Sequence, residues 1–400
     1  MVTGVYYPEI SGASLQCRTL MAALGDRVRC RVLTTTSSRA LPRKAEVDGV
    51  PIQRVIVDLD RPLTKITSAV AMSWIFVRDS PQFEIVHLHG FSQKSILLML
   101  LARILGKRVV VKMSSVGHDD PIGLRRRHPL LYAMFSRADR FISISPAFAE
   151  RYREADLPGA RLVSIPNGVD LIRFSPAAAE LRQAVRHELG WPDNAVVILC
   201  VGFFSSEKQQ QVLFDAWVES RAATADTALT FVGATGSTNN EVDPTIAVRL
   251  LASARALGLA ARFHLIEKRL DIERVYQAAD VFVLPSTREG APNVVLEAMA
   301  SALPCIVSRL PGVTDALIED GENGMLVEPG DRQALAAAIT AVVRDPAFAR
   351  RLGASARTAV ARRFAIDRVA DEHIDMYRSL LQNREPRTPN PEPGTRRCAE

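Results

Sequence analysis

The chain has 400 residues, of which 48% are hydrophobic and 24% are charged, a composition typical of globular rather than disordered proteins. Because one hydrophobic core seldom grows beyond about 250–300 residues, the length predicts two domains. The formal net charge of +6 is modest for this length. It does not indicate nucleic-acid binding, although it suits an anionic substrate or an anionic membrane surface.

The cysteines and the apolar segments bear on the compartment. The five cysteines are scattered, odd in number and without C-x2-C spacing, so neither a disulfide framework nor a zinc site is indicated. A reducing, cytoplasmic location is therefore expected. The N-terminus does not resemble a signal peptide. The longest apolar run, residues 96–105, is interrupted by Arg103 and too short to span a bilayer, which favours a soluble or at most peripheral protein.

In the first half, short apolar segments alternate with helical patterns, which predicts an α/β domain built on a parallel sheet. Residues 1–5 are the first expected strand, which is unusually short, and a helix is expected from about residue 14 to 24. Helices are also expected at residues 94–105 and 146–154. The further expected strands are residues 28–34, 53–57, 85–88, 108–113, 140–144 and 161–165.

A turn cluster at residues 166–170 ends the first half, and the segment 171–179 is interpreted as the linker between the domains. The second half repeats the alternation, which predicts a second parallel sheet. Residues 346–382 are predicted to form a long helical segment, and residues 383–400, rich in Pro, Arg and Glu, are predicted to be disordered. The strands expected in the second half are residues 196–201, 229–232, 262–266, 281–284, 305–308 and 324–327.

The clearest candidate site is the segment 286–300, STREGAPNVVLEAMA. An apolar run precedes it, so the pattern predicts a strand, a tight turn and a helix, with Glu289 before the turn and Glu297 inside the helix. Gly290 would let the backbone approach a ligand closely. Pro292 suits the first helical turn, where its missing N–H costs nothing.

The start of this helix could bind an anion. The free N–H groups of Asn293, Val294 and Val295 would face a phosphate, with the helix dipole behind them. Glu297 could accept hydrogen bonds from vicinal hydroxyls such as those of a ribose, and Glu289 could reach hydroxyls beyond the phosphate. The alternative is an ordinary strand–helix connection with two solvated glutamates.

Several segments together resemble the retaining glycosyltransferases of family four, which have the GT-B fold of two facing Rossmann-like domains with parallel sheets and an interdomain cleft. Residues 285–300 resemble the E-x7-E motif of that family. Residues 165–170, IPNGVD, resemble its domain crossover, and Gly202 with Lys208 resembles its VGR…KG loop. Residues 321–329, GENGMLVEP, match its C-terminal signature. The resemblance covers about residues 6 to 381 and is most specific in the second half.

The resemblance implies a division of labour between the domains. A C-terminal domain of residues 173–364 would hold a nucleotide diphosphate sugar, while residues 1–172, joined by the helix of about residues 365–382, would shape the acceptor site. Glu289 would touch the donor sugar and Glu297 would hold the ribose. Gly12 lies where the family has a glycine-rich loop near the donor phosphate, although a turn glycine is the alternative.

The chain departs from the family pattern at several positions, among them Asp315, where the family usually has Glu. Phe203 stands where the family usually has Arg, so half of the cationic clamp on the diphosphate is missing, while Lys208 remains as a point charge. The glycine after that lysine is Gln209, and the glycine of the family's Gly-x-Pro is Ala302. The other cation of the clamp could come from Arg288, Lys268 or Arg269.

Two histidine segments are further candidates. His87 and His89 end an expected strand, and we expect one of them to point to each face of the sheet. The resemblance favours His89 as the site residue, and a structural histidine is the alternative. His118 could contact an acceptor or sugar hydroxyl. The Asp119–Asp120 pair beside it is a poor metal cage alone, and by resemblance neither a metal nor a cofactor is expected.

Two features of the sequence bear on whether the protein contacts a membrane. The run 125–128, RRRH, is either a solvated loop or a contact for an anionic lipid head group or a lipid diphosphate acceptor. Trp74, with apolar neighbours, is expected in the core, and the alternative is that it extends such a surface.

The predicted activity is retaining transfer of a hexose from a UDP- or GDP-linked donor to a hydroxyl acceptor, either a saccharide or a lipid-linked one. The expected context is synthesis of surface polysaccharide, lipopolysaccharide or glycolipid, at the inner face of the cell membrane. Lys208 would oppose the charge on the leaving diphosphate and Glu289 would orient the sugar. The alternatives are a non-catalytic nucleotide-sugar-binding protein, which Phe203 keeps open, and a sugar-nucleotide epimerase. No nucleic-acid partner is expected.

Overall fold

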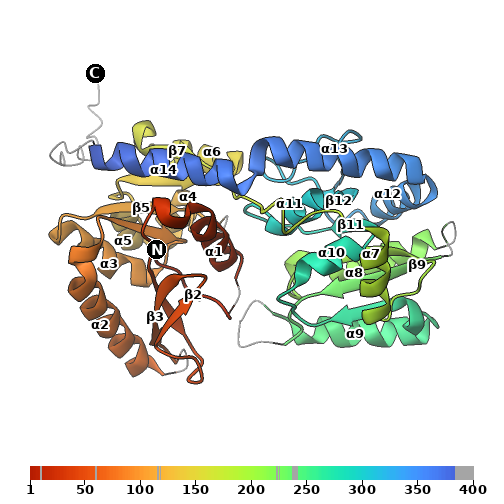
Figure 1. Ribbon diagram of the computed structural model, residues 1–400, viewed down its shortest axis with the longest axis horizontal. Coiled ribbons are helices and arrows are strands. Elements are labelled where there is room, and N and C mark those ends of the chain that lie inside the picture. Colours follow the sequence, from red (N-terminus) through yellow and green to blue (C-terminus); the bar gives the residue numbers. More distant parts are fainter. Residues whose placement is uncertain are drawn as a thin grey trace, which may run out of the picture.

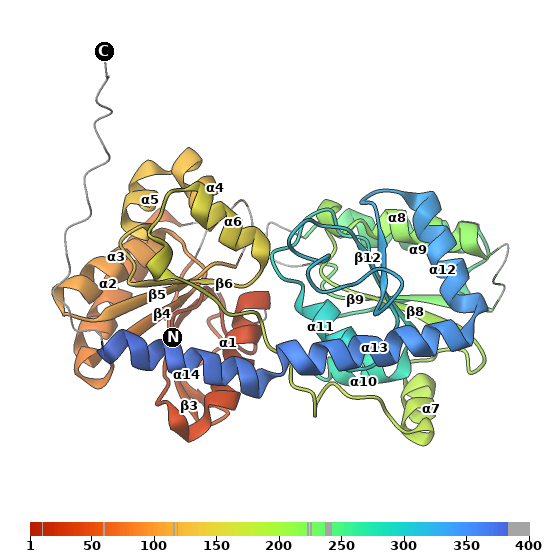
Figure 2. The ribbon, with the colours of Figure 1, turned by 90° about the horizontal axis from the view of Figure 1, so that it is seen from above.

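The computed structural model describes residues 1–9, 11–58, 61–114, 117, 119–221, 224, 226–236 and 242–382. It shows two α/β units side by side, with the two last helices running along both of them (Figures 1 and 2). The predicted tail, residues 383–400, lies outside the described residues.

The second unit is built on a parallel sheet of six strands in the order β10-β9-β8-β11-β12-β13. Ile198 and Cys200 of β8 belong to one hydrophobic cluster, and Val197 and Leu199 belong to another, so both faces of the sheet are covered. This burial explains the continuous apolar runs of these strands. The strands are β8 (Val196–Val201), β9 (Thr227–Val232), β10 (Phe263–Ile266), β11 (Val281–Leu284), β12 (Cys305–Ser308) and β13 (Met325–Val327).

Helices pack on both faces of this sheet. One cluster includes side chains of α8, α9 and α12, and the other includes side chains of α10, α11 and α13. Helix α7 packs on α10. The bounds are α7 (Ala179–Glu188), α8 (Gln210–Ser220), α9 (Pro244–Ala256), α10 (Ile272–Ala278), α11 (Asn293–Ala300), α12 (Arg332–Arg344) and α13 (Pro346–Phe364).

The first unit contains two groups of strands. Four parallel strands follow the order β4-β5-β6-β7, and β1, β3 and β2 form a second group in which β1 and β3 are parallel. The bounds are β1 (Val32–Thr36), β2 (Lys44–Val47), β3 (Val50–Ile56), β4 (Ile85–His89), β5 (Arg108–Lys112), β6 (Arg140–Ser143) and β7 (Leu162–Ser164).

The strand predicted at residues 1–5 is wrong. Only Val2 forms a bridge, to Leu33 of β1 on one side and to Leu88 of β4 on the other. The chain bends at Gly4 and Val5, so the bridge does not lengthen into a strand, although the Thr35 N–H still donates to the Gly4 carbonyl at 3.3 Å. A cavity of about 690 Å³ lies beside the bridge and is lined by residues of β1, β4 and the C-terminal helix.

A hairpin went unpredicted in the same group of strands. β2 pairs antiparallel with β3 through Asp48 and Gly49, whose φ angles are 52° and 76°. An Asp-Gly pair at positive φ is typical of a two-residue hairpin turn, so the sequence did carry this signal.

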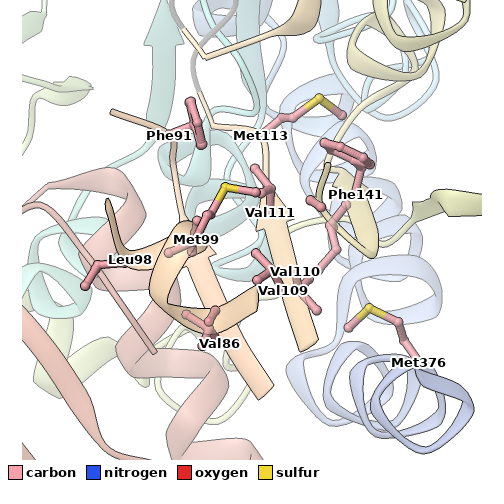
Figure 3. Close-up of a cluster of buried hydrophobic side chains, with 14 of the residues drawn as sticks. Val86, Phe91, Leu98, Met99, Val109, Val110, Val111, Met113, Phe141 and Met376 are labelled. Atoms are coloured by element: carbon pink, nitrogen blue, oxygen red, sulfur yellow. The ribbon is translucent and has the colours of Figure 1, made fainter. Parts of the chain in front are cut away.

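The C-terminal helix α14 (Ile366–Gln382) completes the core of the first unit. It packs on α1, and its side chains share one hydrophobic cluster with those of the β4–β5 region. Figure 3 shows Met376 of α14 in the same cluster of buried side chains as Val86 of β4 and Val110 of β5. The remaining helices are α1 (Gly12–Leu24), α2 (Pro62–Asp79), α3 (Gln93–Ile104), α4 (Pro121–Arg127), α5 (Pro129–Phe135) and α6 (Pro146–Glu154).

The structure confirms the predicted α/β class with two units on parallel sheets. It contradicts the expectation that Trp74 lies in the core, because this side chain of α2 is 62% exposed. The inner face of α2 is formed instead by Met72, Ile75 and Phe76, which are buried.

Candidate active site

The segment with the two glutamates connects β11 to α11. Pro292 is the N-cap residue of α11 and makes no side-chain cap. Within the described residues, the N–H groups of Asn293 and Val294 donate to no protein acceptor, whereas the N–H of Val295 donates to the Pro292 carbonyl at 3.1 Å. The expectation for Val295 is therefore wrong, and two free N–H groups mark the helix start.

Lys208 and Glu289 form an ion pair beside the turn that joins β11 to α11. The Lys208 Nζ lies 2.6 Å from the Glu289 Oε1, and the two side chains are only 16% and 10% exposed. Lys208 ends a short 3-10 helix, Ser206–Lys208, which follows β8. The Thr287 N–H donates to the Glu207 carbonyl at 2.8 Å and holds the two segments together. The structure thus brings the two predicted catalytic residues into direct contact.

Of the three candidates for a second cation, Arg288 adjoins Glu289 in the chain, whereas Lys268 donates to the Pro8 carbonyl at 3.4 Å. The Arg288 guanidinium lies 2.8 Å from the Glu207 carboxylate, so the two segments are joined by two adjacent ion pairs. Arg269 is bound to Glu188 and Asp271. Arg288 is therefore the better placed arginine to accompany Lys208.

Phe203 lies beside the lysine. The Lys208 Nζ is 5.5 Å from the centre of the Phe203 ring, within the range of a cation–π contact. The alkyl chain of Lys208 runs along Gly202, where an added Cβ would lie 3.7 Å from the Lys208 Cδ. Sequence reasoning missed Gly233, where an added Cβ would lie 2.0 Å from the Gly202 carbonyl oxygen. Gly233 therefore allows the ends of β8 and β9 to approach.

The two residues that replace family glycines have a backbone conformation that favours glycine. Gln209 has φ 53° and Ala302 has φ 58°, both in the left-handed region that glycine occupies without steric cost. The Gln209 side chain donates to the Ser206 carbonyl at 2.6 Å. The turn geometry is therefore retained although the glycines are not.

Glu297 points its carboxylate at Tyr276. The Tyr276 hydroxyl donates to Glu297 Oε2 at 2.9 Å. Burial of the carboxyl group raises its pKa to about 7, although the Tyr276 hydrogen bond and Arg173 act in the opposite direction. A carboxyl group that accepts a hydrogen bond from a tyrosine hydroxyl here could also accept hydrogen bonds from the hydroxyls of a bound ligand.

This raised pKa predicts a pH-dependent stability. The ordinary pKa is 4.5, so between pH 4.5 and 7 the folded chain holds a proton that the unfolded chain releases. The free energy of unfolding should therefore fall as the pH rises through this window, by at most about 1.4 kcal/mol per pH unit. Glu297→Gln should remove that slope. Urea denaturation at pH 5, 6, 7 and 8 measures it, with the exposed Glu328→Gln as control; an unchanged slope in Glu297→Gln would contradict the assignment.

The starts of α1 and α11 meet at the crossover between the units. The Asn293 side chain donates to the Gly12 carbonyl at 3.2 Å and accepts from the Asn167 amide at 2.8 Å. Gln16 exchanges two hydrogen bonds with the backbone of Gly168. The structure thus brings the predicted residues Gly12 and Asn293 together, with the N-termini of two helices at one place.

Gly290 is close to the first unit. An added Cβ would lie 2.7 Å from the Ser114 carbonyl oxygen and 3.3 Å from the Phe148 ring, and the Ser145 hydroxyl donates to the Gly290 carbonyl at 2.9 Å. The Ala147 N–H also donates to the Gly312 carbonyl at 3.1 Å. The close approach at Gly290 is therefore one of the contacts by which the units close on each other.

Gly290→Ala is expected to separate the two units at this contact. Because the obstructing atom is a backbone oxygen, the units must move apart, and misplacement by about 1 Å can lower catalysis roughly 100-fold. We expect a loss of at least about tenfold in kcat/KM. Steady-state kinetics and small-angle X-ray scattering check it against Gly159→Ala, where an added Cβ meets nothing within 4 Å. Equal activity of the two variants would contradict the prediction.

The histidines of β4 do not point to opposite faces, so that expectation is wrong. The rings of His87 and His89 stack with centres 4.3 Å apart, because two positions along a strand return to the same face. Both are buried beneath α14, where His87 Nδ1 lies 2.6 Å from the Tyr377 hydroxyl. Burial, and then the nearby Lys112, hold the pKa of His89 well below its usual range. His89 therefore belongs to a buried cluster and not to the Lys208–Glu289 pair.

His118 lies outside the described residues. The carboxylates that follow it serve the local fold: Asp119 accepts from the Ser114 N–H and hydroxyl, and Asp120 caps α4. Among the described residues, no group of three or more His, Cys, Asp or Glu side chains is arranged to hold a metal ion.

Comparison with known proteins places this geometry in a family. Residues 11–168 match the model of the glycosyl transferase 4-like domain, and residues 182–359 match that of the glycosyl transferases group 1. EpsD of Bacillus subtilis is 28% identical over 351 residues, 85% of this chain and 87% of its own length. The UDP-Gal:alpha-D-GlcNAc-diphosphoundecaprenol alpha-1,3-galactosyltransferase of Escherichia coli is 28% identical, over 76% of this chain and 77% of its own length.

Solved structures show the same architecture. Anabaena HepE in complex with UDP and glucose superposes with a TM-score of 0.76 at 19% identity, covering 94% of this chain and 99% of that one. Sucrose-phosphate synthase of Thermosynechococcus elongatus has a TM-score of 0.76 at 22% identity, covering 96% and 99%. The fold is GT-B, as the motifs implied. With both family models matched in order, the chain belongs to the group 1 glycosyltransferases.

Proposed function

We propose that this glycosyltransferase moves a hexose from a UDP- or GDP-linked donor to a hydroxyl acceptor, with retention at the anomeric carbon. The observation that carries the proposal is the Lys208–Glu289 ion pair at 2.6 Å beside the uncapped start of α11. A cation, a carboxylate and free N–H groups then lie around one turn, which suits a sugar attached to a diphosphate. HepE, solved with UDP and glucose, supports the choice of donor.

The donor would lie along the second unit, residues 173–364. The N–H groups of Asn293 and Val294 and the Lys208 ammonium would hold the diphosphate, while Gly202, Gly290 and Pro292 keep the surrounding turns close. Glu297 would accept hydrogen bonds from the ribose in addition to that from Tyr276. On binding, the ammonium of Lys208 would pass from Glu289 to the diphosphate, which frees Glu289 to hold hydroxyls of the sugar.

Catalysis would come mainly from stabilising the leaving group. As the bond to the anomeric carbon breaks, negative charge grows on the diphosphate, and Lys208 with the α11 start opposes it. Closure of the two units at Gly290 would exclude water from the reacting sugar. The diphosphate would assist deprotonation of the acceptor on the same face, which gives retention. No cofactor and no metal ion takes part in this scheme.

The first unit, residues 1–172 with the helix of residues 365–382, would shape the acceptor site. The acceptor would be a saccharide or a lipid-linked sugar, in synthesis of surface polysaccharide, lipopolysaccharide or glycolipid. The E. coli relative, whose name gives a diphosphoundecaprenol acceptor, supports the lipid-linked choice. The protein would then work in the cytoplasm at the inner face of the membrane, in contact with anionic lipid.

A panel of nucleotide sugars tests the proposal. The true donor should raise the melting temperature of the protein and release nucleoside diphosphate when an acceptor is present, because ligand stabilisation grows with occupancy. Stabilisation without release for any acceptor would favour a non-catalytic binding protein. Conversion of the donor sugar without an acceptor would favour an epimerase.

A further inference from the structure

Helix α2 presents apolar side chains to solvent along one face. The positions are spaced by three or four residues, which places them on one side of a helix. Their exposed fractions run from 43% to 76%: Leu63, Ile66, Val70, Trp74 and Val77. The opposite side of α2 packs into the hydrophobic core through Met72, Ile75 and Phe76. The exposed apolar side chains therefore take no part in attaching α2 to the first unit.

Helix α3 extends this apolar surface. It packs against α2 and exposes Leu97, Leu100 and Ile104, the last of them 79% exposed. Leu97 lines a shallow groove together with Ile66, Val70 and Trp74 of α2, so the two helices share one surface. We call these eight residues the α2–α3 face. Contiguous apolar surface of this kind marks a binding site in a folded protein.

Before Asp79, its last residue, α2 carries basic side chains and no acidic ones, and α3 likewise carries none. The sequence has no Asp or Glu between Asp60 and Asp79, and none between Glu84 and Asp119. Lys65 of α2 and Arg103 of α3 are exposed. The Arg78 guanidinium lies 4.8 Å from the centre of the Trp74 ring but is paired with Asp79 at 2.7 Å, so the charge of this region comes from Lys65 and Arg103. A surface built in this way favours an anionic partner.

A basic corner adjoins α3. Helix α5 packs on both α3 and α4, and Figure 2 shows α4 and α5 at the same end of the first unit. Residues 125–130, RRRHPL, are all exposed at the junction of α4 and α5, with Leu130 at 85%. Residues 125–130 therefore combine basic side chains with an exposed apolar one, as the α2–α3 face does.

We propose that the α2–α3 face and this basic corner dock on an anionic lipid bilayer. The apolar side chains enter the boundary between head groups and acyl chains, Trp74 lies at the interface, and the arginines contact the head groups. Within the described part of the chain, no helix is long and apolar enough to cross a membrane, so the helices lie on the surface. The inference deepens the proposed function, on which it rests for the role of a lipid-linked acceptor.

Vesicle sedimentation tests the face with the full chain. We expect binding to vesicles of phosphatidylcholine with 40% phosphatidylglycerol, weaker binding as salt is raised, and little binding to phosphatidylcholine alone. The triple variant Ile66→Ser/Val70→Ser/Trp74→Ser should bind at least about tenfold more weakly. Arg125→Gln and Arg126→Gln should each cost roughly fivefold, from about 1 kcal/mol per basic residue at an anionic surface. Val248→Ser, a 67% exposed valine of the second unit, should change nothing.

Each outcome decides the proposal. No binding to anionic vesicles, or equal binding to neutral ones, would overturn it. A dimer that the triple variant makes monomeric, without vesicle binding, would assign the face to a second copy of the chain. Nucleoside diphosphate release with a soluble acceptor separates this proposal from the proposed transfer activity. Variants that release nucleoside diphosphate normally but bind no vesicles support the membrane-binding role of the face. A wild type that binds vesicles but releases no nucleoside diphosphate refutes only the transfer activity.

Discussion

Lys208→Met is expected to lower kcat for sugar transfer by about 10²–10³-fold, or ~2.7–4 kcal/mol of transition-state stabilisation. Lys208 is the cation in contact with Glu289, at 2.6 Å, and it lies beside the free N–H groups of α11. Methionine keeps the length of the side chain and removes its charge. The loss should appear mainly in kcat, because negative charge on the diphosphate grows as the bond to the sugar breaks.

The variant leaves Glu289 without its partner, so a second variant separates the two effects. In Lys208→Met/Glu289→Gln no carboxylate is left unpaired, and we expect no recovery of kcat. Recovery in the double variant would show that the lysine only neutralises Glu289 and would contradict its role on the leaving group. Lys44→Met, at an exposed lysine of β2, is the matched control and should react as the wild type. Single-turnover measurements of nucleoside diphosphate release provide the rates.

Gly233→Ala is expected to damage both the fold and the donor site. The new Cβ would lie 2.0 Å from the Gly202 carbonyl oxygen and 2.6 Å from its carbon, and neither atom can move by a side-chain rotation. Backbone hydrogen bonds hold both residues to the sheet: the Gly202 N–H donates to the Val232 carbonyl, and the Gly233 N–H donates to the Ile266 carbonyl. We expect the free energy of unfolding to fall by about 1–3 kcal/mol or more.

The same clash should displace the loop that carries Lys208, so nucleoside diphosphate affinity should fall as well. Gly236→Ala is a close control, because Gly236 follows β9 in the same loop as Gly233 and an added Cβ there meets nothing within 4 Å. Urea denaturation and titration calorimetry measure the two effects. If Gly233→Ala kept wild-type stability and affinity, the contact between the ends of β8 and β9 would not matter for the site.

Much of the fold and part of the site could be predicted because their signals are local. Apolar runs interrupted by turns predicted the strands of the second unit, and the segment 281–300 predicted strand, turn and helix at the observed place. The Asp48–Gly49 hairpin was predictable in the same way and was overlooked. At Gln209 and Ala302 the residue type suggested a departure, yet the turn conformation is retained because the surrounding chain imposes it.

Local sequence patterns indicated most of the strands and helices, and they placed Glu289, Asn293 and Glu297 around one helix start. The contacts of those side chains depend on the packing of segments that are distant in the chain. Lys208 reaches Glu289 from a loop 81 positions away, and α14 covers His87 from 290 positions away. Trp74 is exposed because, in the described part of the chain, no segment covers that side of α2. Periodicity and turn chemistry act over a few residues, whereas partner and exposure depend on which distant element packs there.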